Sequence, residues 1–282
     1  MKPSKKRKQT LPTTVVTPCE FKGEKQQKRR DSPDDASAVT NTAMSQTSVI
    51  LPSSSRHNFE TNSLDHCETP LCAYQHIQPL LEMVSKQLNM ESSKLRIYDP
   101  YYCDGAVIRH LASLGYDNVI NENTDFYQRI QENTIPEYDV LLTNPPYSDD
   151  HIERLLHFVT QQNRKPFCLL MPNWVARKAD YKSIINGTNL IYLSPIAPYS
   201  YIMPTWSDKP KHVDECTGET TPYLSSWYIS IKNHKNLDMN IVKERFDAIS
   251  RKEKRPTWVV AKTVKGLKWK IRNVIKKKAC KS

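Results

Sequence analysis

The sequence predicts an α/β fold with a largely parallel sheet. Short apolar strand patterns alternate with helical patterns along residues 66–231, there is no internal repeat, and the most informative motif directly follows a strand. Strands that alternate with helices are typical of parallel sheets. We therefore expect one domain at 66–240, between an N-terminal tail at 1–65 and a C-terminal segment at 241–282.

The individual elements follow from capping residues and spacing. Thr69 and Pro70 predict a helix start, with Thr69 as the cap and Pro70 at the first helical position. Apolar residues then recur every three or four positions as far as Leu88. A second helix begins at Ala106 and is closed by Gly115. The other expected elements are strands at 95–99, 118–121, 139–143, 167–171, 190–193 and 226–231, and helices at 152–158 and 176–185.

The charge of +11 is concentrated at the two ends of the chain. Residues 1–62 carry a net charge of +5 and residues 241–282 carry +12, whereas residues 63–240 carry −6. Basic ends favour polyanionic partners such as nucleic acid. No run approaches the ~20 apolar residues of a transmembrane helix, so we expect no membrane span.

The N-terminal tail has the composition of a disordered segment. It is rich in Ser, Thr, Pro, Gln and Lys and shows no sustained periodicity. Its basic clusters at 5–8 and 28–30 suit a bipartite nuclear import signal and, equally, a merely solvated tail. Seven cysteines without Cys-x-x-Cys spacing fit a reducing compartment, and the charged start is not a secretory signal. We therefore expect an intracellular protein, with the nucleus favoured and the cytoplasm possible.

The C-terminal segment predicts a basic amphipathic helix, weakened by Gly266. Lysines occupy its other faces, and its apolar face consists of Val260, Val264, Leu267, Ile271 and Val274. Two interpretations carry equal weight. Either the apolar face docks on the domain, or the helix binds an anionic polymer or a membrane surface.

The most informative motif is Asn144-Pro145-Pro146-Tyr147, which follows the apolar strand at 139–143. Ligands of open parallel sheets bind beyond the carboxyl ends of the strands, where this motif is expected. The prolines stiffen the turn and hold the Asn144 amide and the Pro145 carbonyl in a fixed relation. Both groups accept hydrogen bonds, so they suit the two N–H bonds of one exocyclic amine. Tyr147 offers a face on which a flipped base can stack, and we interpret all four residues as catalytic.

This motif resembles that of the S-adenosylmethionine (SAM)-dependent amino-methyltransferases, the Rossmann-like class I enzymes, and especially their adenine-N6 branch. Further matches follow in the same order, at Glu68-Thr69-Pro70, Asp99–Gly105, Thr124-Asp125-Phe126 and Leu170–Trp174, so the resemblance covers about 66–231. It implies methyl transfer to the exocyclic amine of adenine in RNA or DNA. It also implies SAM as cofactor and no metal, with SAM bound by Thr69, Asp99, Pro100, Cys103, Gly105, Glu122, Asp125 and Phe126.

The resemblance is incomplete in the cofactor region. Gly105 is the only glycine of a loop that carries several in the family. Only about thirty residues separate Gly115 from Asn144, where the family fits two strands and a helix. We therefore expect a shortened second-strand region, in which the strand at 118–121 is either the second strand or a third strand whose predecessor is lost. Glu122 is the available carboxylate for the ribose hydroxyls.

Several alternatives stay open at this point. RNA is slightly favoured over DNA, since the family's DNA enzymes usually carry a large recognition domain, and a protein partner could supply specificity. Methylation of protein glutamine or lysine is one rival function, and nucleic-acid binding without catalysis is another. A zinc site is a weaker interpretation of the closely spaced residues His66, Cys67, Cys72 and His76.

Overall fold

The computed structural model describes residues 57–62, 65–204, 219–220, 224–231, 237–253 and 256–279. The basic clusters expected at 5–8 and 28–30 lie outside these residues. In the described part of the chain, no helix is both long enough and apolar enough to span a bilayer.

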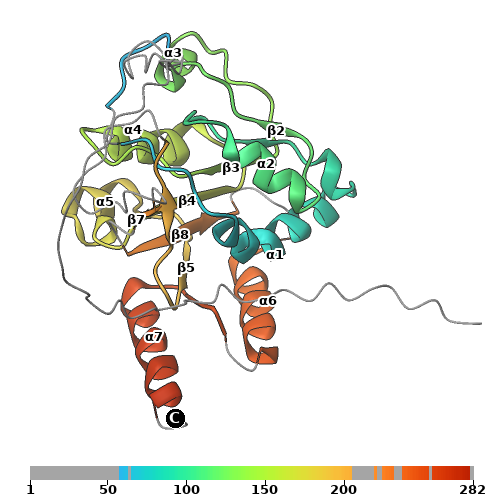
Figure 1. Cartoon of the computed structure of the whole chain (residues 1–282), viewed down its shortest axis with the longest axis vertical. Coiled ribbons are helices and arrows are strands. Elements are labelled where there is room, and N and C mark those ends of the chain that lie inside the picture. Colours follow the sequence, from blue (N-terminus) through green and yellow to red (C-terminus); the bar gives the residue numbers. More distant parts are fainter. Residues whose placement is uncertain are drawn as a thin grey trace, which may run out of the picture. The chain divides into compact units, whose positions relative to one another are not determined.

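Seven of the described strands form the main sheet, in the order β2-β1-β3-β4-β8-β5-β9 (Figure 1). These strands are β1 (Ile97–Tyr98), β2 (Val119–Ile120), β3 (Val140–Thr143), β4 (Phe167–Pro172), β5 (Ile191–Pro195), β8 (Ser225–Ser230) and β9 (Trp258–Ala261). Strands β2, β1, β3 and β4 pair in parallel, whereas β8 is antiparallel to both β4 and β5, and β9 is antiparallel to β5. A separate small sheet pairs β6 (Tyr201–Ile202) with β7 (Glu219–Thr220).

Helices cover both faces of the sheet. The α-helices are α1 (Leu71–Gln87), α2 (Ala106–Ser113), α3 (Phe126–Gln131), α4 (His151–His157), α5 (Ala179–Ile184), α6 (Met239–Lys252) and α7 (Val264–Ala279). Shorter helical turns are η3 (Ser92–Lys94), η4 (Phe158–Gln162) and η5 (Val175–Arg177). Side chains alternate between faces along a strand. Thus Val140 and Leu142 of β3 share a core with α1, α2 and α6, which we call the first core. Leu141 shares a core with α3, α4, α5 and α7 on the other face, which we call the second core.

The strand order creates the crevice in which a ligand can bind. After β1 the chain moves outward to β2, and it then returns to the other side of β1 for β3 and β4. Ligands of doubly wound sheets bind at such a reversal, beyond the carboxyl ends of the strands. Residues Asp99, Asn121 and Asn144 follow β1, β2 and β3 directly, so all three lie at this crevice.

The strand at 118–121 pairs directly with β1, with Ile97 opposite Val119. In doubly wound sheets the second strand holds this place. This corrects the alternative interpretation of the segment as a third strand. Within the described residues no strand lies beyond β2, and the short helix α3, which the sequence analysis did not predict, leads back to β3.

The helix expected at 106–114 forms as α2 and ends as predicted. Gly115 has φ +86°, which a residue with a side chain adopts only with strain. Its N–H donates to the Ala112 carbonyl at 2.9 Å, and the N–H of Tyr116 donates to Leu111 at 3.0 Å. These bonds satisfy carbonyl groups that the helix end leaves free.

Three sequence expectations change in the structure. Val260 lies in strand β9 and not on the C-terminal helix, which begins at Val264. Strand β9 belongs to the main sheet and α6 packs on the first core, so residues 241–253 and 256–279 contribute to the sheet domain. Pro70, and not Thr69, is the N-cap of α1, so Pro70 lies one position before the first helical residue.

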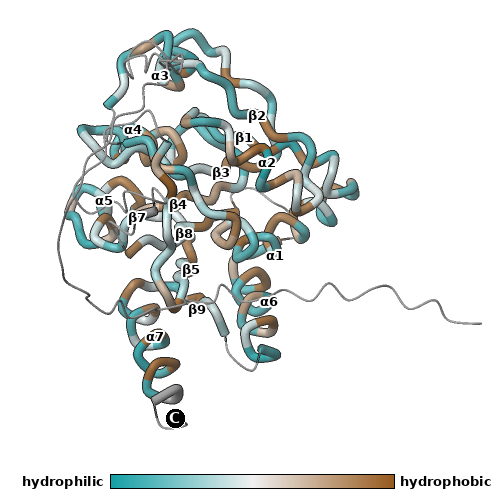
Figure 2. Tube along the Cα trace, in the orientation of Figure 1, coloured by the Kyte–Doolittle hydropathy of each residue, from teal (hydrophilic) through white to brown (hydrophobic). Residues whose placement is uncertain are grey.

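The apolar face of α7 docks on the domain, which was one of its two expected arrangements. Leu267 is buried in the second core, and Val264, Ile271 and Val274 pack against that core. In Figure 2, hydrophobic and hydrophilic residues alternate around α7, as this one-sided packing requires. A cation–carboxylate contact of 2.8 Å between Lys270 of α7 and Asp247 of α6 joins the two helices.

Candidate active site

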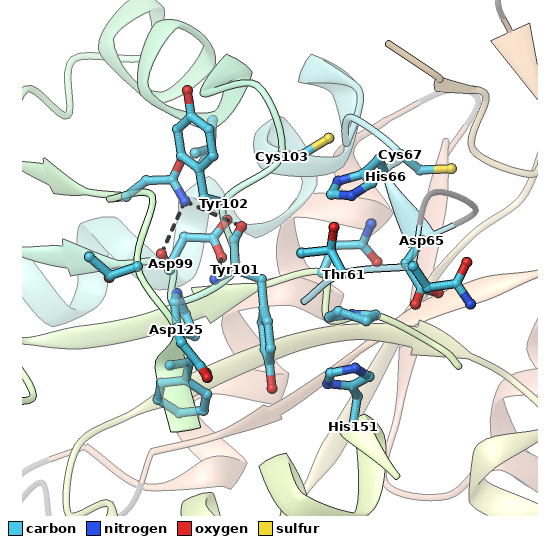
Figure 3. A pocket seen from close by; sticks show the side chains of 18 of the residues that line it. Thr61, Asp65, His66, Cys67, Asp99, Tyr101, Tyr102, Cys103, Asp125 and His151 are labelled. Carbon is cyan, nitrogen blue, oxygen red and sulfur yellow. Dashed lines mark hydrogen bonds between the residues drawn. The ribbon is translucent and has the colours of Figure 1, made fainter. Parts of the chain in front are cut away.

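A pocket opens at the carboxyl ends of β1, β2 and β3 (Figure 3). It brings together nine residues expected from the sequence, namely Thr69, Asp99, Pro100, Cys103, Gly105, Asp125, Phe126, Asn144 and Pro146. Three expected residues, Glu122, Pro145 and Tyr147, are not among its lining residues. Seven of the eight expected cofactor residues and two of the four expected catalytic residues therefore share one concave site.

The candidate catalytic turn, residues 144–147, leaves a fully buried strand, β3, whose end is tied to the end of β1. The Thr143 hydroxyl donates to Asp99 Oδ1 at 2.6 Å, across the reversal in strand order. Asn144 comes next, and the Tyr147 hydroxyl donates to its Oδ1 at 2.6 Å or to the Leu170 carbonyl at 3.1 Å. The Asn144 amide is therefore held with its oxygen toward Tyr147. The Tyr147 hydroxyl faces Asn144 and β4, and stacking of its ring on a base stays a prediction.

Residues 59–62 and 65–69 form one side of the pocket, and we call them the N-terminal wall. From their composition, residues up to 65 were expected to belong to the disordered tail, yet Thr61 and Asp65 lie across the pocket from Asp99 and Asp125 (Figure 3). The wall lacks periodicity because it belongs to no helix or long strand. It is held by contacts with residues far away in the sequence.

Asp65 connects this wall to the catalytic turn. Its Oδ1 accepts hydrogen bonds from the backbone N–H groups of Tyr147 and Ser148, each at 3.2 Å. Its Oδ2 accepts a hydrogen bond from the Ser148 hydroxyl. One carboxylate thus accepts three hydrogen bonds from the residues that follow Pro146.

Glu68 connects the same wall to the loop after β1. Its Oε1 accepts from the backbone N–H of Asp104 at 2.7 Å. Burial raises the pKa of Glu68, and hydrogen bonds from the backbone of Asp104 and Ala106 and from Cys103 oppose that shift. Gly105, which follows Asp104 in the loop after β1, lines the pocket and has φ +74°. A residue with a side chain would be strained in this backbone conformation.

Asp99 is the buried acid at the floor of the pocket. Burial raises its pKa to about 7, while hydrogen bonds from the Thr143 hydroxyl and the Tyr101 backbone N–H oppose the rise. Its carboxyl group is therefore close to the balance between the neutral and the charged form near neutral pH. A cation bound in this pocket would favour the charged form.

Asn121 also lines the pocket, although its sequence context did not single it out. Its Nδ2 donates to the carbonyls of Asp99 and Tyr101 at 3.1 and 3.3 Å, and these bonds are drawn in Figure 3. Its Oδ1 is buried and makes no hydrogen bond within the described part of the protein. The neighbouring Glu122, which was expected to hold a ribose, forms an ion pair with Arg129 and leaves 55% of its side chain exposed. Asn121 lines the pocket and Glu122 does not, so ribose binding by Glu122 stays a prediction.

Asp125 and Phe126 begin helix α3 on the far side of the pocket. Asp125 caps that helix, and its Oδ1 accepts from the Tyr127 backbone N–H at 2.8 Å. Phe126 is buried and packs edge-on against Tyr101, with their ring centroids 5.4 Å apart. The aspartate therefore presents a carboxylate to the pocket from a helix start that is anchored in the second core.

A chain of hydrogen-bonded side chains lines the rim next to α4. The hydroxyls of Tyr101 and Tyr127 lie 2.8 Å apart, and the Tyr127 hydroxyl lies 2.8 Å from His151 Nδ1. The guanidinium of Arg154 lies 3.4 Å from the centroid of the Tyr127 ring. These groups can hold a polar ligand and can pass a proton along the chain.

The residues considered for zinc have other contacts. His66 stacks on His57 with centroids 4.9 Å apart, and burial lowers the pKa of His66 to about 4. His76 Nδ1 lies 2.8 Å from the Tyr199 hydroxyl. The residues that the structure describes contain no cluster of three or more potential metal ligands.

No protein-family model matches the sequence, and no curated protein matches it. Among solved structures, the chain is similar to the crystal structure of the type IIG restriction endonuclease BpuSI, with 14% identity and a TM-score of 0.34. The match covers 70% of this chain and 31% of that one, so this chain spans about a third of that protein's length. A likeness of this extent carries no argument about activity, which must follow from the pocket itself.

Proposed function

We propose that this protein is a SAM-dependent methyltransferase that acts on the exocyclic amine of adenine in nucleic acid. One observation carries the proposal. The Asn144-Pro145-Pro146-Tyr147 turn leaves the carboxyl end of β3, and Asn144 opens into the same pocket as the Asp99–Gly105 loop and Asp125. The strand order supports the class I, Rossmann-like sheet that the sequence resemblance implies, with β2 as its outermost described strand.

The chemistry of the lining residues fits SAM. Two carboxyl groups, those of Asp99 and Asp125, suit a ligand that carries positive charge and an adenine amino group. The buried Oδ1 of Asn121 needs a donor, and the hydroxyls of a ribose are such donors. Gly105 keeps the loop backbone free of a side chain at the pocket. When bound, SAM supplies the methyl group.

The catalytic turn acts on the acceptor amine. Asn144 Oδ1 and the Pro145 carbonyl each accept one N–H of the amine, which directs the nitrogen lone pair away from both acceptors. The Tyr147 hydroxyl fixes the orientation of the Asn144 amide before substrate arrives, because it donates to Oδ1 at 2.6 Å. Such preorganised contacts are worth ~10²–10³ in rate. The ring of Tyr147 stacks on the flipped base.

The favoured substrate is RNA, with DNA second, and a protein partner supplies target specificity. The charge distribution supports a polyanion, since basic ends flank an acidic centre. The proposed site of action is inside the cell, with the nucleus favoured.

The decisive experiment incubates the full chain with methyl-labelled SAM and, in separate reactions, total RNA, genomic DNA and a protein lysate. We expect label in nucleic acid as N6-methyladenine, and we expect Asn144→Ala to lower its rate of incorporation ~10²–10³-fold. Label in glutamine or lysine side chains would replace this proposal with protein methylation. Failure to bind SAM in an equilibrium titration would leave a nucleic-acid-binding protein without catalysis.

A further inference from the structure

Helix α7 presents an exposed stripe on the side away from the sheet. Its inner residues pack on the second core, whereas five residues at spacings of three and four share the outer face. We call these five residues the α7 stripe, and they are Lys265, Lys268, Trp269, Arg272 and Lys276. All five are exposed.

The stripe is an aromatic side chain surrounded by cations. Trp269 is 65% exposed, although a tryptophan usually buries much of its large surface. Lys265 lies one turn before it and Arg272 one turn after it. In the described part of the protein, the four cations of the stripe form no ion pair, unlike Lys270, which contacts Asp247.

Positive charges that flank an exposed aromatic ring match one ligand chemistry closely. Single-stranded nucleic acid offers phosphates at regular intervals and unpaired bases whose faces stack on aromatic side chains. A duplex offers the phosphates but keeps its bases stacked inside. A membrane surface requires a broad apolar face of a helix. In α7 most of that face packs on the domain, and Ile275 and Trp269 are its exposed large apolar side chains.

We propose that the α7 stripe binds unpaired nucleic acid, with its four cations on phosphates and Trp269 stacked on a base. The inference rests on the proposed function only for the choice of polymer, and it narrows the substrate class to single-stranded or looped regions. Strand β9, on which α7 packs, lies four strand spacings from β3, or about 19 Å across the sheet. A substrate that reaches both the stripe and the pocket must therefore extend over several nucleotides.

The test measures binding alone, so it is independent of methyl transfer. Fluorescence anisotropy of the full chain is recorded with a labelled single strand of about 16 nucleotides and with its duplex. Trp269→Ala should weaken single-strand binding roughly 5- to 100-fold, and Trp269→Phe should restore most of it, because stacking needs only an aromatic face. Duplex binding should change less than about twofold, since it lacks the stacked base.

A charge series tests the phosphate contacts. The triple variant Lys265→Gln, Arg272→Gln, Lys276→Gln should flatten the slope of log affinity against log salt by about 2, or ~0.7 for each lost contact on a single strand. A matched control, Lys86→Gln, Lys94→Gln, Arg109→Gln, removes the same charge from three exposed positions outside α7 and should leave the slope unchanged.

Three results would overturn the inference. The first is wild-type single-strand affinity in Trp269→Ala, and the second is equal salt slopes in the two triple variants. The third is binding of phosphatidylcholine–phosphatidylserine vesicles that Trp269→Ala abolishes while oligonucleotide binding persists, which would assign the stripe to a membrane surface. If binding follows the predicted pattern and no methyl transfer is found, the inference stands and the proposed activity fails.

Discussion

Replacing Asp65 with Ala tests whether the N-terminal wall holds the catalytic turn in place. The change removes three accepted hydrogen bonds, two from the backbone N–H groups of Tyr147 and Ser148 and one from the Ser148 hydroxyl. Hydrogen bonds to a charged group are worth about 1.5–3 kcal/mol, but these donors are half-buried and regain water. About 1 kcal/mol for each gives a loss of 2–3 kcal/mol for the set. If the transition state loses all of this stabilisation, kcat falls roughly 30- to 150-fold.

A double-mutant cycle isolates this contact from general damage. Asp65→Ala, Ser148→Ala and the double variant are compared by kcat and by urea unfolding, and we expect a coupling energy of about 0.5–3 kcal/mol. Asp65→Asn keeps an oxygen for the two N–H groups and should recover much of the rate. The exposed Asp117 provides the control, because Asp117→Ala removes the same charge away from the pocket.

Either of two outcomes would contradict the role of Asp65 in holding the turn. Asp65→Ala with wild-type kcat would mean that the turn keeps its geometry without the wall. A coupling energy near zero would mean that Asp65 and Ser148 act separately, so that any loss in Asp65→Ala comes from elsewhere.

The other site residues give three further predictions. Asn144→Ala removes one amine acceptor, so turnover should fall ~10²–10³-fold while a titration shows unchanged SAM affinity. Asp125→Ala should weaken SAM binding and Gly105→Val should abolish it, because a branched residue is strained at φ +74°; calorimetry that finds wild-type affinity in both folded variants would locate the cofactor elsewhere. Burial raises the pKa of Asp99 from 3.8 to about 7, so the folded state keeps a proton that the unfolded chain releases, and stability should fall as the pH rises through that window. The free energy of unfolding of Asp99→Asn, measured in urea, should not show this fall with rising pH. Parallel curves of unfolding free energy against pH for the variant and the wild type would contradict the prediction.

The sequence predicts those parts of the site that follow clear strands. Val140–Thr143 is a run of apolar and β-branched residues, so the place of Asn144 at the carboxyl end of a strand follows from local pattern alone. The same logic applies to Asp99 after β1. Placing these residues at one crevice needs only the rule that parallel strands end on the same edge of the sheet.

Other parts depend on contacts that no local pattern reports. Strand β9 has all four residues buried, so it lacks alternation, and Val260 continues the helical spacing of Val264 and Leu267. Periodicity cannot separate such a short buried strand from a helix turn. Asn121 was missed because the carboxylate of Glu122 is the more obvious ribose ligand, and only the structure reveals which of two adjacent side chains faces the pocket. Asp65 accepts a hydrogen bond from Ser148, which lies 83 positions later in the sequence, and no local pattern indicates such a contact.

The N-terminal wall contacts both loops on which the proposed chemistry depends. Asp65 holds the residues after Pro146, and Glu68, three positions later, holds the backbone of Asp104. These two loops leave different strands, β3 and β1, whose ends are joined at the pocket floor by the Thr143–Asp99 hydrogen bond. The relative position of the loops is therefore fixed twice, by the sheet at the floor and by the wall at the rim. Reacting groups must be held within ~0.5 Å of their productive geometry. In the proposed reaction, a segment in which the sequence predicts no element would therefore determine the alignment of amine and methyl donor.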